Sequence, residues 1–389
     1  MTEILGFPYF GLPLFRPSMV QPELAGILLS YDLQGQVVAT APLKTGHINT
    51  TYVVHVETNG GRRLRFVLQQ INSRVFKNVP ALMENLTRVT THLRRKADDN
   101  GGGKVLSVVP TQQGAHSLRD AEGEWWRVFH FIEGAHSVDR VKTEEQARQA
   151  ARAFGLFQAH LADLDGGRLH ETILQFHHTP SRVQALRAAI AEDPVRRAVE
   201  VQPEIEFVLS RLADADVLLD LVAAGQLTER VTHNDTKINN VMLDDRTGRA
   251  VAVVDLDTVM PGLALYDFGD LVRASASSTA EDDPDAGNMH VVLPLFRALV
   301  EGWLEAGAAP TAIEREHLPF AGKLIAYELG VRFLADYLQG DVYFKVQHPE
   351  HNLHRARTQF ALVSSIEREA AAMARIVDDV AKEINGVGL

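Results

Sequence analysis

The sequence of 389 residues contains no cysteine, which excludes disulfide bonds, thiolate metal sites and cysteine nucleophiles. It has no apolar run of about 18 residues, so no membrane span is expected, and its first residues do not resemble a secretory signal. Basic side chains number 39 against 50 acidic ones, and this net charge of −11, without a basic tail, argues against nucleic-acid binding. We therefore expect a cytoplasmic protein that binds neither nucleic acid nor membrane, with a monomer as the default.

Hydrophobic residues make up 46% of the chain, enough for a sizeable core, and the length favours two lobes. The first third is rich in Val and Thr and predicts strands at residues 36–41, 51–58 and 64–71, the last two joined by an Asn-Gly-Gly turn. A helix should begin near Pro80. A further strand at 125–132 runs into Glu133-Gly134, which is a natural break point.

Beyond Gly134 the pattern becomes helical, with helices expected at 144–164, 203–224 and 320–338 and one short hairpin between residues 240 and 254. These patterns predict an α+β fold with two lobes. The first, residues 1–132, is built on a small antiparallel sheet, and the second, residues 133–389, is larger and mainly helical. A ligand held between two such lobes is a common arrangement.

The segment HNDTKINN, residues 233–240, carries the most informative chemistry because it has the spacing H-x-D-x-x-x-x-N of a kinase catalytic loop. Phosphoryl transfer needs one carboxylate to orient the attacking hydroxyl and nearby oxygen ligands for Mg²⁺. Asp235 fits the first role and Asn240 the second. Asp255 follows the paired strand, and Asp257 would lie on the same face if that strand continued. A purely structural turn cap at Asp235, and a structural hydrogen bond at Asp257, are the alternatives.

The triplet Asp267-Phe268-Gly269 has the letters of the metal-binding motif of protein kinases. No apolar strand precedes it, however, and residues 266–273 look like the start of a helix. We therefore interpret Asp267 as a helix cap or a support of the catalytic loop.

Taken together, the chain resembles the aminoglycoside phosphotransferase and choline kinase superfamily, which has a protein-kinase-like fold, and within it is most similar to N-acetylhexosamine 1-kinases. The resemblance covers roughly residues 35 to 365 and is carried by TGHINTTYVV, FVLQQINSRVFKNVPALMENL, HNDTKINN, DLDTVMPGLALYDFGD and ELGVRFLADYLQGDVYFKVQHPEHNLHRAR. It implies transfer of the γ-phosphoryl group of ATP, with Mg²⁺, to the anomeric hydroxyl of N-acetylglucosamine or N-acetylgalactosamine. The lobe 1–132 would bind nucleotide, and the lobe 133–389 would carry catalysis and the sugar.

The resemblance also implies residue roles. Asp235 becomes the catalytic carboxylate, and Asn240 with Asp255 become the magnesium ligands. Residues 45–52 become the turn over the phosphates, where Gly46 permits a close backbone approach. His47 lies at this turn and could reach sugar or phosphate, although an inconsequential surface histidine fits the sequence equally well.

Backbone groups near Phe131 and Ile132 would bind adenine. The strand position of the usual ATP lysine is occupied by the neutral amide of Gln69. Lys77 or Lys237 could supply the missing charge, or nucleotide affinity could be modest. Glu84 is the obvious acidic residue of the helix predicted to begin near Pro80. Its spacing from the apolar residues of that helix argues against a pair with Gln69.

Sugar recognition should come from the second lobe. Arg332 lies outside the apolar stripe of the predicted helix 320–338, and Tyr343 follows Gly340, the predicted cap of that helix. A guanidinium and a phenol suit hexose hydroxyls and an N-acetyl carbonyl. A salt bridge between Arg332 and Asp336, and ordinary packing of Tyr343, are the competing interpretations.

Two other functions stay open. The chain could be a kinase of another small alcohol, such as a different hexose, an aminoglycoside, choline or homoserine. It could also be an inactive binding protein with a kinase fold, an idea motivated by Gln69 and opposed by the intact Asp235, Asn240 and Asp255.

Overall fold

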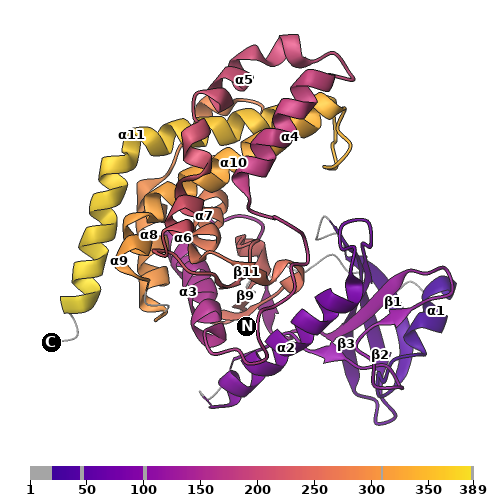
Figure 1. Ribbon diagram of the computed structural model, residues 1–389. Helices are drawn as coiled ribbons and strands as arrows, with labels where there is room; N and C mark the ends of the chain where they lie inside the picture. Colours follow the sequence, from indigo (N-terminus) through magenta and orange to yellow (C-terminus); the bar gives the residue numbers. More distant parts are fainter. Residues whose placement is uncertain (1–19, 44–47, 100–102, 308–309, 387–389) are drawn as a thin grey trace, which may run out of the picture. The chain divides into compact units, whose positions relative to one another are not determined.

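The computed structural model describes residues 20–43, 48–99, 103–307 and 310–386 (Figure 1). These residues divide into two compact units. The first contains the described residues up to Val79 together with Ser107–Phe131, and the second contains Pro80–Leu106 and the described residues from Ile132 onwards. The functional boundary at 132/133 remains a prediction.

The first unit is built on a six-stranded sheet in which the pairs are antiparallel, as predicted. Its order is β1-β2-β3-β6-β4, with β5 also paired to β6. The bounds are β1 Gln36–Leu43, β2 Thr50–Glu57, β3 Arg63–Ile71, β4 Val108–Val109, β5 Leu118–Arg119 and β6 Trp125–His130. A short helix, α1 (Pro22–Leu28), precedes the sheet.

One face of this sheet forms the core of the first unit, because side chains alternate between the two faces along each strand. Phe66 and Leu68 of β3 are buried in one cluster with Val128 of β6 and with Leu24 and Leu28 of α1. The residues that alternate with these along the strands, including Gln69 of β3 and Arg127 of β6, therefore lie on the opposite face of the sheet. The register places these two residues directly across from each other.

The second unit is mainly helical. Its helices are α2 Val79–Asp99, α3 Glu144–Leu161, α4 Thr179–Glu192, α5 Gln202–Leu209, α6 Val217–Ala223, α7 Ala264–Ser275, α8 Leu293–Glu305, α9 Ala312–Glu316, α10 Leu318–Gln339 and α11 His351–Gly386. Two small antiparallel sheets are embedded among them, β10-β9-β7 and β11-β8. Their strands are β7 Ala135–His136, β8 Arg230–Thr232, β9 Val241–Asp244, β10 Ala250–Val253 and β11 Met260–Gly262.

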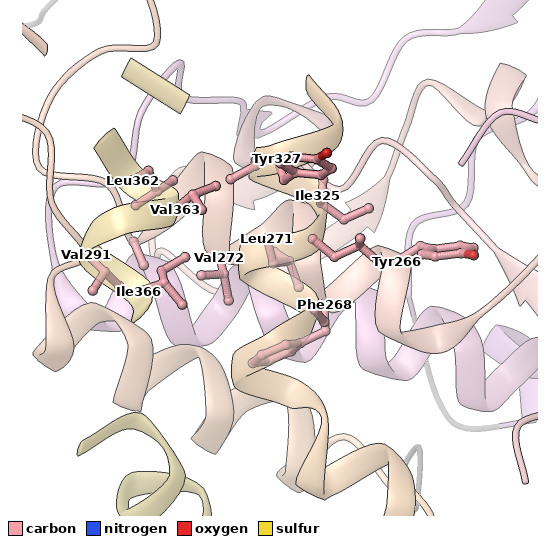
Figure 2. Packing of buried hydrophobic residues seen from close by; sticks show 14 of the residues in the cluster. Tyr266, Phe268, Leu271, Val272, Val291, Ile325, Tyr327, Leu362, Val363 and Ile366 are labelled. Atoms are coloured by element: carbon pink, nitrogen blue, oxygen red, sulfur yellow. The ribbon is translucent and has the colours of Figure 1, made fainter. Parts of the chain in front are cut away.

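Helices α7 and α10 form the centre of the core of the second unit. Phe268 and Leu271 of α7 and Ile325 of α10 are fully buried there, and Figure 2 shows them together with residues of α11. Gly269 faces the backbone of Ala321 so closely that a Cβ atom would overlap its carbonyl oxygen. This close approach fixes α7, from which the acidic residues of the candidate site project.

The predicted helix 203–224 is wrong in one respect, because it is broken into α5 and α6 with a 3-10 turn, Leu212–Ala215, between them. Ion pairs from Arg211 to Glu367 and from Asp214 to Lys323 fix this break. Such pairings outweigh helix propensity. By contrast, α10 ends as predicted at Gly340, whose φ of 92° suits glycine. Within the described ranges no helix is both long and apolar enough to cross a membrane.

Candidate active site

Asp235 lies in the loop that leaves β8 and enters β9 through the 3-10 turn Ile238–Asn240. Its Oδ1 pairs with Nζ of Lys237 at 2.8 Å, and Nδ2 of Asn240 donates to its Oδ2 at 3.1 Å. Partial burial opposes ionisation, but the charge and hydrogen bond of Lys237 outweigh it and lower the pKa of Asp235 to about 2. The carboxylate is thus ionised at neutral pH, and 28% of its side-chain surface remains exposed.

The backbone of this loop is held by two carboxylates at the start of α7. Oδ2 of Asp267 accepts the N–H of His233 at 2.9 Å, and its Oδ1 accepts the N–H of Asn234 at 2.7 Å. Asp270 accepts the N–H of Thr236 at 2.8 Å. The interpretation of Asp267 as a support of the loop is therefore confirmed.

His233 ties the loop to the end of β10. Its Nδ1 accepts the N–H of Asp235 at 3.3 Å, so Nε2 carries the proton and donates to the carbonyl of Val254 at 3.0 Å. The N–H of Val254 in turn donates to the carbonyl of Asn240 at 2.9 Å. These bonds bring the segment that carries Asp255 next to the segment that carries Asn240.

Asp255 and Asp257 do not share one strand face. The strand β10 ends at Val253, Asp255 adopts a left-handed conformation with φ 58°, and a 3-10 turn, Leu256–Thr258, follows. Asp255 is consequently exposed, whereas Asp257 is only 3% exposed and its carbonyl accepts the hydroxyl of Thr172. The strand does not continue to Asp257, because the backbone turns at Asp255, so the condition for a shared face is not met.

Asn240 and Asp255 fit a magnesium site of the kind completed by phosphate and water. Because Nδ2 of Asn240 donates to Asp235, the amide oxygen is the atom left for a cation. Within the described residues no group of three or more His, Asp or Glu side chains could hold a metal ion unaided. Mg²⁺ usually needs only one or two carboxylates, with substrate phosphates and water as its other ligands.

In the first unit, Gln69 is engaged within the sheet. Its amide oxygen accepts Nε and Nη2 of Arg127 at 3.1 and 2.8 Å, and its Nε2 donates to Thr51 at 3.2 Å. Arg127 thus places a guanidinium beside the neutral amide. The sequence did not single out this cation, because only the register between β3 and β6 reveals it. Glu84 instead pairs with His170 at 3.0 Å.

Further nucleotide-site predictions concern Gly46, His47, Phe131 and Ile132. Gly46 and His47 lie outside the described residues. The N–H of Phe131 donates to the carbonyl of Arg65 at 3.2 Å, and the Arg65 guanidinium stacks on the Phe131 ring. The N–H of Phe131 is therefore used within the first unit, and adenine binding by the backbone of Phe131 and Ile132 stays a prediction.

Arg332 and Tyr343 are brought together in the second unit. The guanidinium of Arg332 lies 5.8 Å from the ring centre of Tyr343, and 5.5 Å from those of Phe176 and Phe344. Tyr343 is 57% exposed and so is not a core residue. Among the described residues Arg332 forms no ion pair with a carboxylate. The competing interpretation, a salt bridge between Arg332 and Asp336, is therefore wrong.

Asp336 instead bonds to the backbone of the loop that follows α10. Its carboxylate accepts the backbone N–H groups of Val342, Tyr343 and Phe344 at 2.8–3.0 Å and a side-chain N–H of Asn352. It therefore shapes the loop after Gly340 that presents the Tyr343 ring. An acidic residue near the end of the predicted helix is the one local signal of this role in the sequence.

Comparison with known proteins assigns the chain to a family. Residues 40–308 match the model of the phosphotransferase enzyme family, which is more than half of the chain. The chain belongs to this family of small-molecule phosphotransferases and has its kinase-like fold. The more specific resemblance to N-acetylhexosamine 1-kinases is not decided by this match.

Solved structures with a similar fold share little sequence with this chain. A microcompartment-associated aminopropanol kinase is 17% identical with a TM-score of 0.55, over 90% of this chain and 97% of its own. An aminoglycoside phosphotransferase from Alicyclobacillus acidocaldarius is 16% identical with a TM-score of 0.56, over 94% and 97%. Spectinomycin phosphotransferase in complex with ADP and spectinomycin is 12% identical with a TM-score of 0.55, over 92% and 99%.

Proposed function

We propose that this protein transfers the γ-phosphoryl group of ATP to the anomeric hydroxyl of an N-acetylhexosamine and forms the sugar 1-phosphate. The observation that carries the proposal is the ionised Asp235, bonded to Lys237 and Asn240 on the HNDTKINN loop. The grouping of Arg332 with Tyr343 supports a sugar as the acceptor.

Asp235 orients the acceptor hydroxyl as a hydrogen-bond acceptor. A carboxylate with a pKa near 2 is a weak base, so it takes the proton late, after bonding to phosphorus has made the hydroxyl acidic. Lys237 keeps this carboxylate ionised and places a positive charge beside the reacting oxygen. When bound at Asn240 and Asp255, Mg²⁺ would neutralise charge on the phosphates.

We assign nucleotide binding to the predicted lobe 1–132. We assign the phosphate turn to Gly46 and His47, the adenine contacts to backbone groups of Phe131 and Ile132, and a polar contact near the phosphates to Gln69. Because Arg127 bonds to Gln69, the pair carries the positive charge that the amide alone lacks. Asp257 is the alternative metal ligand to Asp255.

The proposal is tested with purified protein, ATP and Mg²⁺ across N-acetylglucosamine, N-acetylgalactosamine, unsubstituted hexoses, choline, homoserine and an aminoglycoside. We expect the fastest turnover with an N-acetylhexosamine, with the phosphate on C1 by NMR. Turnover confined to another alcohol would keep the phosphotransferase and discard the sugar. ATP binding with no transfer to any acceptor would favour an inactive binding protein.

Replacing Arg332 with Ala should raise the sugar KM at least about tenfold, because a charge-assisted hydrogen bond contributes roughly 1.5–3 kcal/mol. The ATP KM should stay unchanged. Arg211→Ala is the matched control, since Arg211 also stacks on an aromatic ring but is tied to Glu367. Equal rises in both Michaelis constants for the Arg332 variant would refute direct sugar contact.

A further inference from the structure

His177 is a buried histidine that contacts the catalytic loop from outside it. Its Nδ1 lies 2.9 Å from Oε1 of Glu328 on α10, and its Nε2 lies 3.2 Å from the carbonyl oxygen of Asn234. Only 4% of the His177 side chain and none of the Glu328 side chain is exposed. Asn234 immediately precedes Asp235.

The partners of His177 determine its protonation. A carbonyl oxygen can only accept, so Nε2 must carry a proton. The second oxygen of Glu328 accepts the hydroxyl of Thr179 at 2.8 Å, and when Glu328 is ionised Nδ1 must carry a proton as well. Neutral histidine has only one N–H, and therefore, with an ionised Glu328, both contacts are satisfied together by the imidazolium.

The charges around His177 agree with this state. Burial alone would lower the pKa of His177, but the charge and hydrogen bond of Glu328 outweigh it, and the net pKa is raised. Burial would likewise raise the pKa of Glu328, yet His177 and then Arg332 lower it. Among the described residues, Asp270 and Tyr266 of α7 also lie near the ring, and Arg182 of α4 lies near Glu328.

The carbonyl that His177 holds belongs to a residue in an unusual conformation. Asn234 has φ 63°, which is uncommon for a residue other than glycine and persists only where the surroundings enforce it. Its N–H is bonded to Asp267 and its side chain to Thr258, so His177 supplies the bond on the carbonyl side. The direction of the next peptide, and hence of Asp235, depends on this bond.

Glu328 also connects His177, which holds the carbonyl of Asn234, to α10. Arg332 lies one helical turn further along the same helix, and its charge contributes to the ionised state of Glu328. A single buried carboxylate thus faces both the imidazolium behind the catalytic loop and the guanidinium assigned to the sugar.

We propose that His177 and Glu328 are positioning residues of the phosphoryl-transfer site, in which the imidazolium of His177 fixes the carbonyl of Asn234, and with it Asp235, while Glu328 couples that support to the helix of Arg332. The inference rests on the proposed function in that it concerns the same site. It does not depend on which alcohol is the acceptor.

The kinetic test compares His177→Gln and Glu328→Gln with the wild type, using the best acceptor found. His177→Gln should lower kcat roughly 10- to 100-fold, because small misplacements of a catalytic group are costly, and leave the ATP KM unchanged. Glu328→Gln should shift the basic limb of the kcat profile to lower pH by about one unit or more, since an imidazolium without its carboxylate loses its proton more easily.

His92→Gln is the matched control. His92 is buried in the same unit and contacts a carbonyl and a carboxylate, those of His160 and Asp163, but not the catalytic loop. We expect its kcat to match the wild type. Equal losses in the His177 and His92 variants, or a basic limb that stays in place in Glu328→Gln, would overturn the proposal.

A second measurement needs no acceptor and so separates this inference from the proposed function. In protein labelled with ¹⁵N-histidine, the signal that disappears in His177→Gln should be that of an imidazolium at pH 7.5, when most of the 16 histidines are neutral. A neutral ring at that pH would refute the inference even if sugar phosphorylation were found. If His177→Gln fails to fold, the histidine signal that loses its charge in Glu328→Gln serves the same purpose.

Discussion

Replacing Asp235 with Asn is expected to lower kcat by about 10²- to 10⁴-fold, the range for loss of a general base or proton-orienting group. The amide keeps the size of the carboxylate but cannot accept the hydroxyl proton. Nucleotide binding should be nearly unchanged, because no nucleotide contact is assigned to Asp235. Turnover would be measured with the preferred acceptor, and ADP affinity by calorimetry.

Asp244→Asn is the control for this exchange. Asp244 ends β9, just beyond the catalytic loop, and its carboxylate accepts the N–H and the hydroxyl of Thr247 within its own hairpin turn. Its variant should retain wild-type kcat. Near-normal turnover of Asp235→Asn would remove Asp235 from the reaction. Weakened ADP binding as well would show that Lys237, once its partner is neutral, perturbs the nucleotide site.

The sequence was sufficient for those features that depend on local pattern. The richness in Val and Thr predicted the first strands of the sheet, and the apolar stripe with Gly340 predicted α10. The spacing of HNDTKINN predicted that Asp235 and Asn240 belong to one site, and the structure joins them by a hydrogen bond. Each of these features is set by residues close together in the chain.

Features set by distant parts of the chain were not predicted. Arg127 meets Gln69 only because β6 is inserted beside β3, and His177 meets Glu328 across a long sequence separation. The turn at Asp255, which takes Asp257 off the strand, was not predicted for a different reason. An apolar run predicts a strand but not the residue at which the backbone turns left-handed.

Replacing Asp267 with Asn should destabilise the protein and also slow catalysis. The carboxylate accepts three N–H groups, from His233, Asn234 and the side chain of Gln158, and it is fully buried. An amide offers one oxygen and turns an NH₂ group toward at least one of these donors. A buried donor left without a partner costs about 1–3 kcal/mol, which urea unfolding would measure.

The loss of kcat should reach roughly 10- to 100-fold, because the loosened backbone on both sides of His233 no longer holds Asp235 in place. Asp336→Asn separates this effect from general instability. Asp336 is equally buried and accepts three backbone N–H groups, but in the loop that carries Tyr343. It should lose similar stability and raise the sugar KM while kcat changes little. If both variants lose kcat in proportion to stability, Asp267 supports the fold and not the catalytic loop in particular.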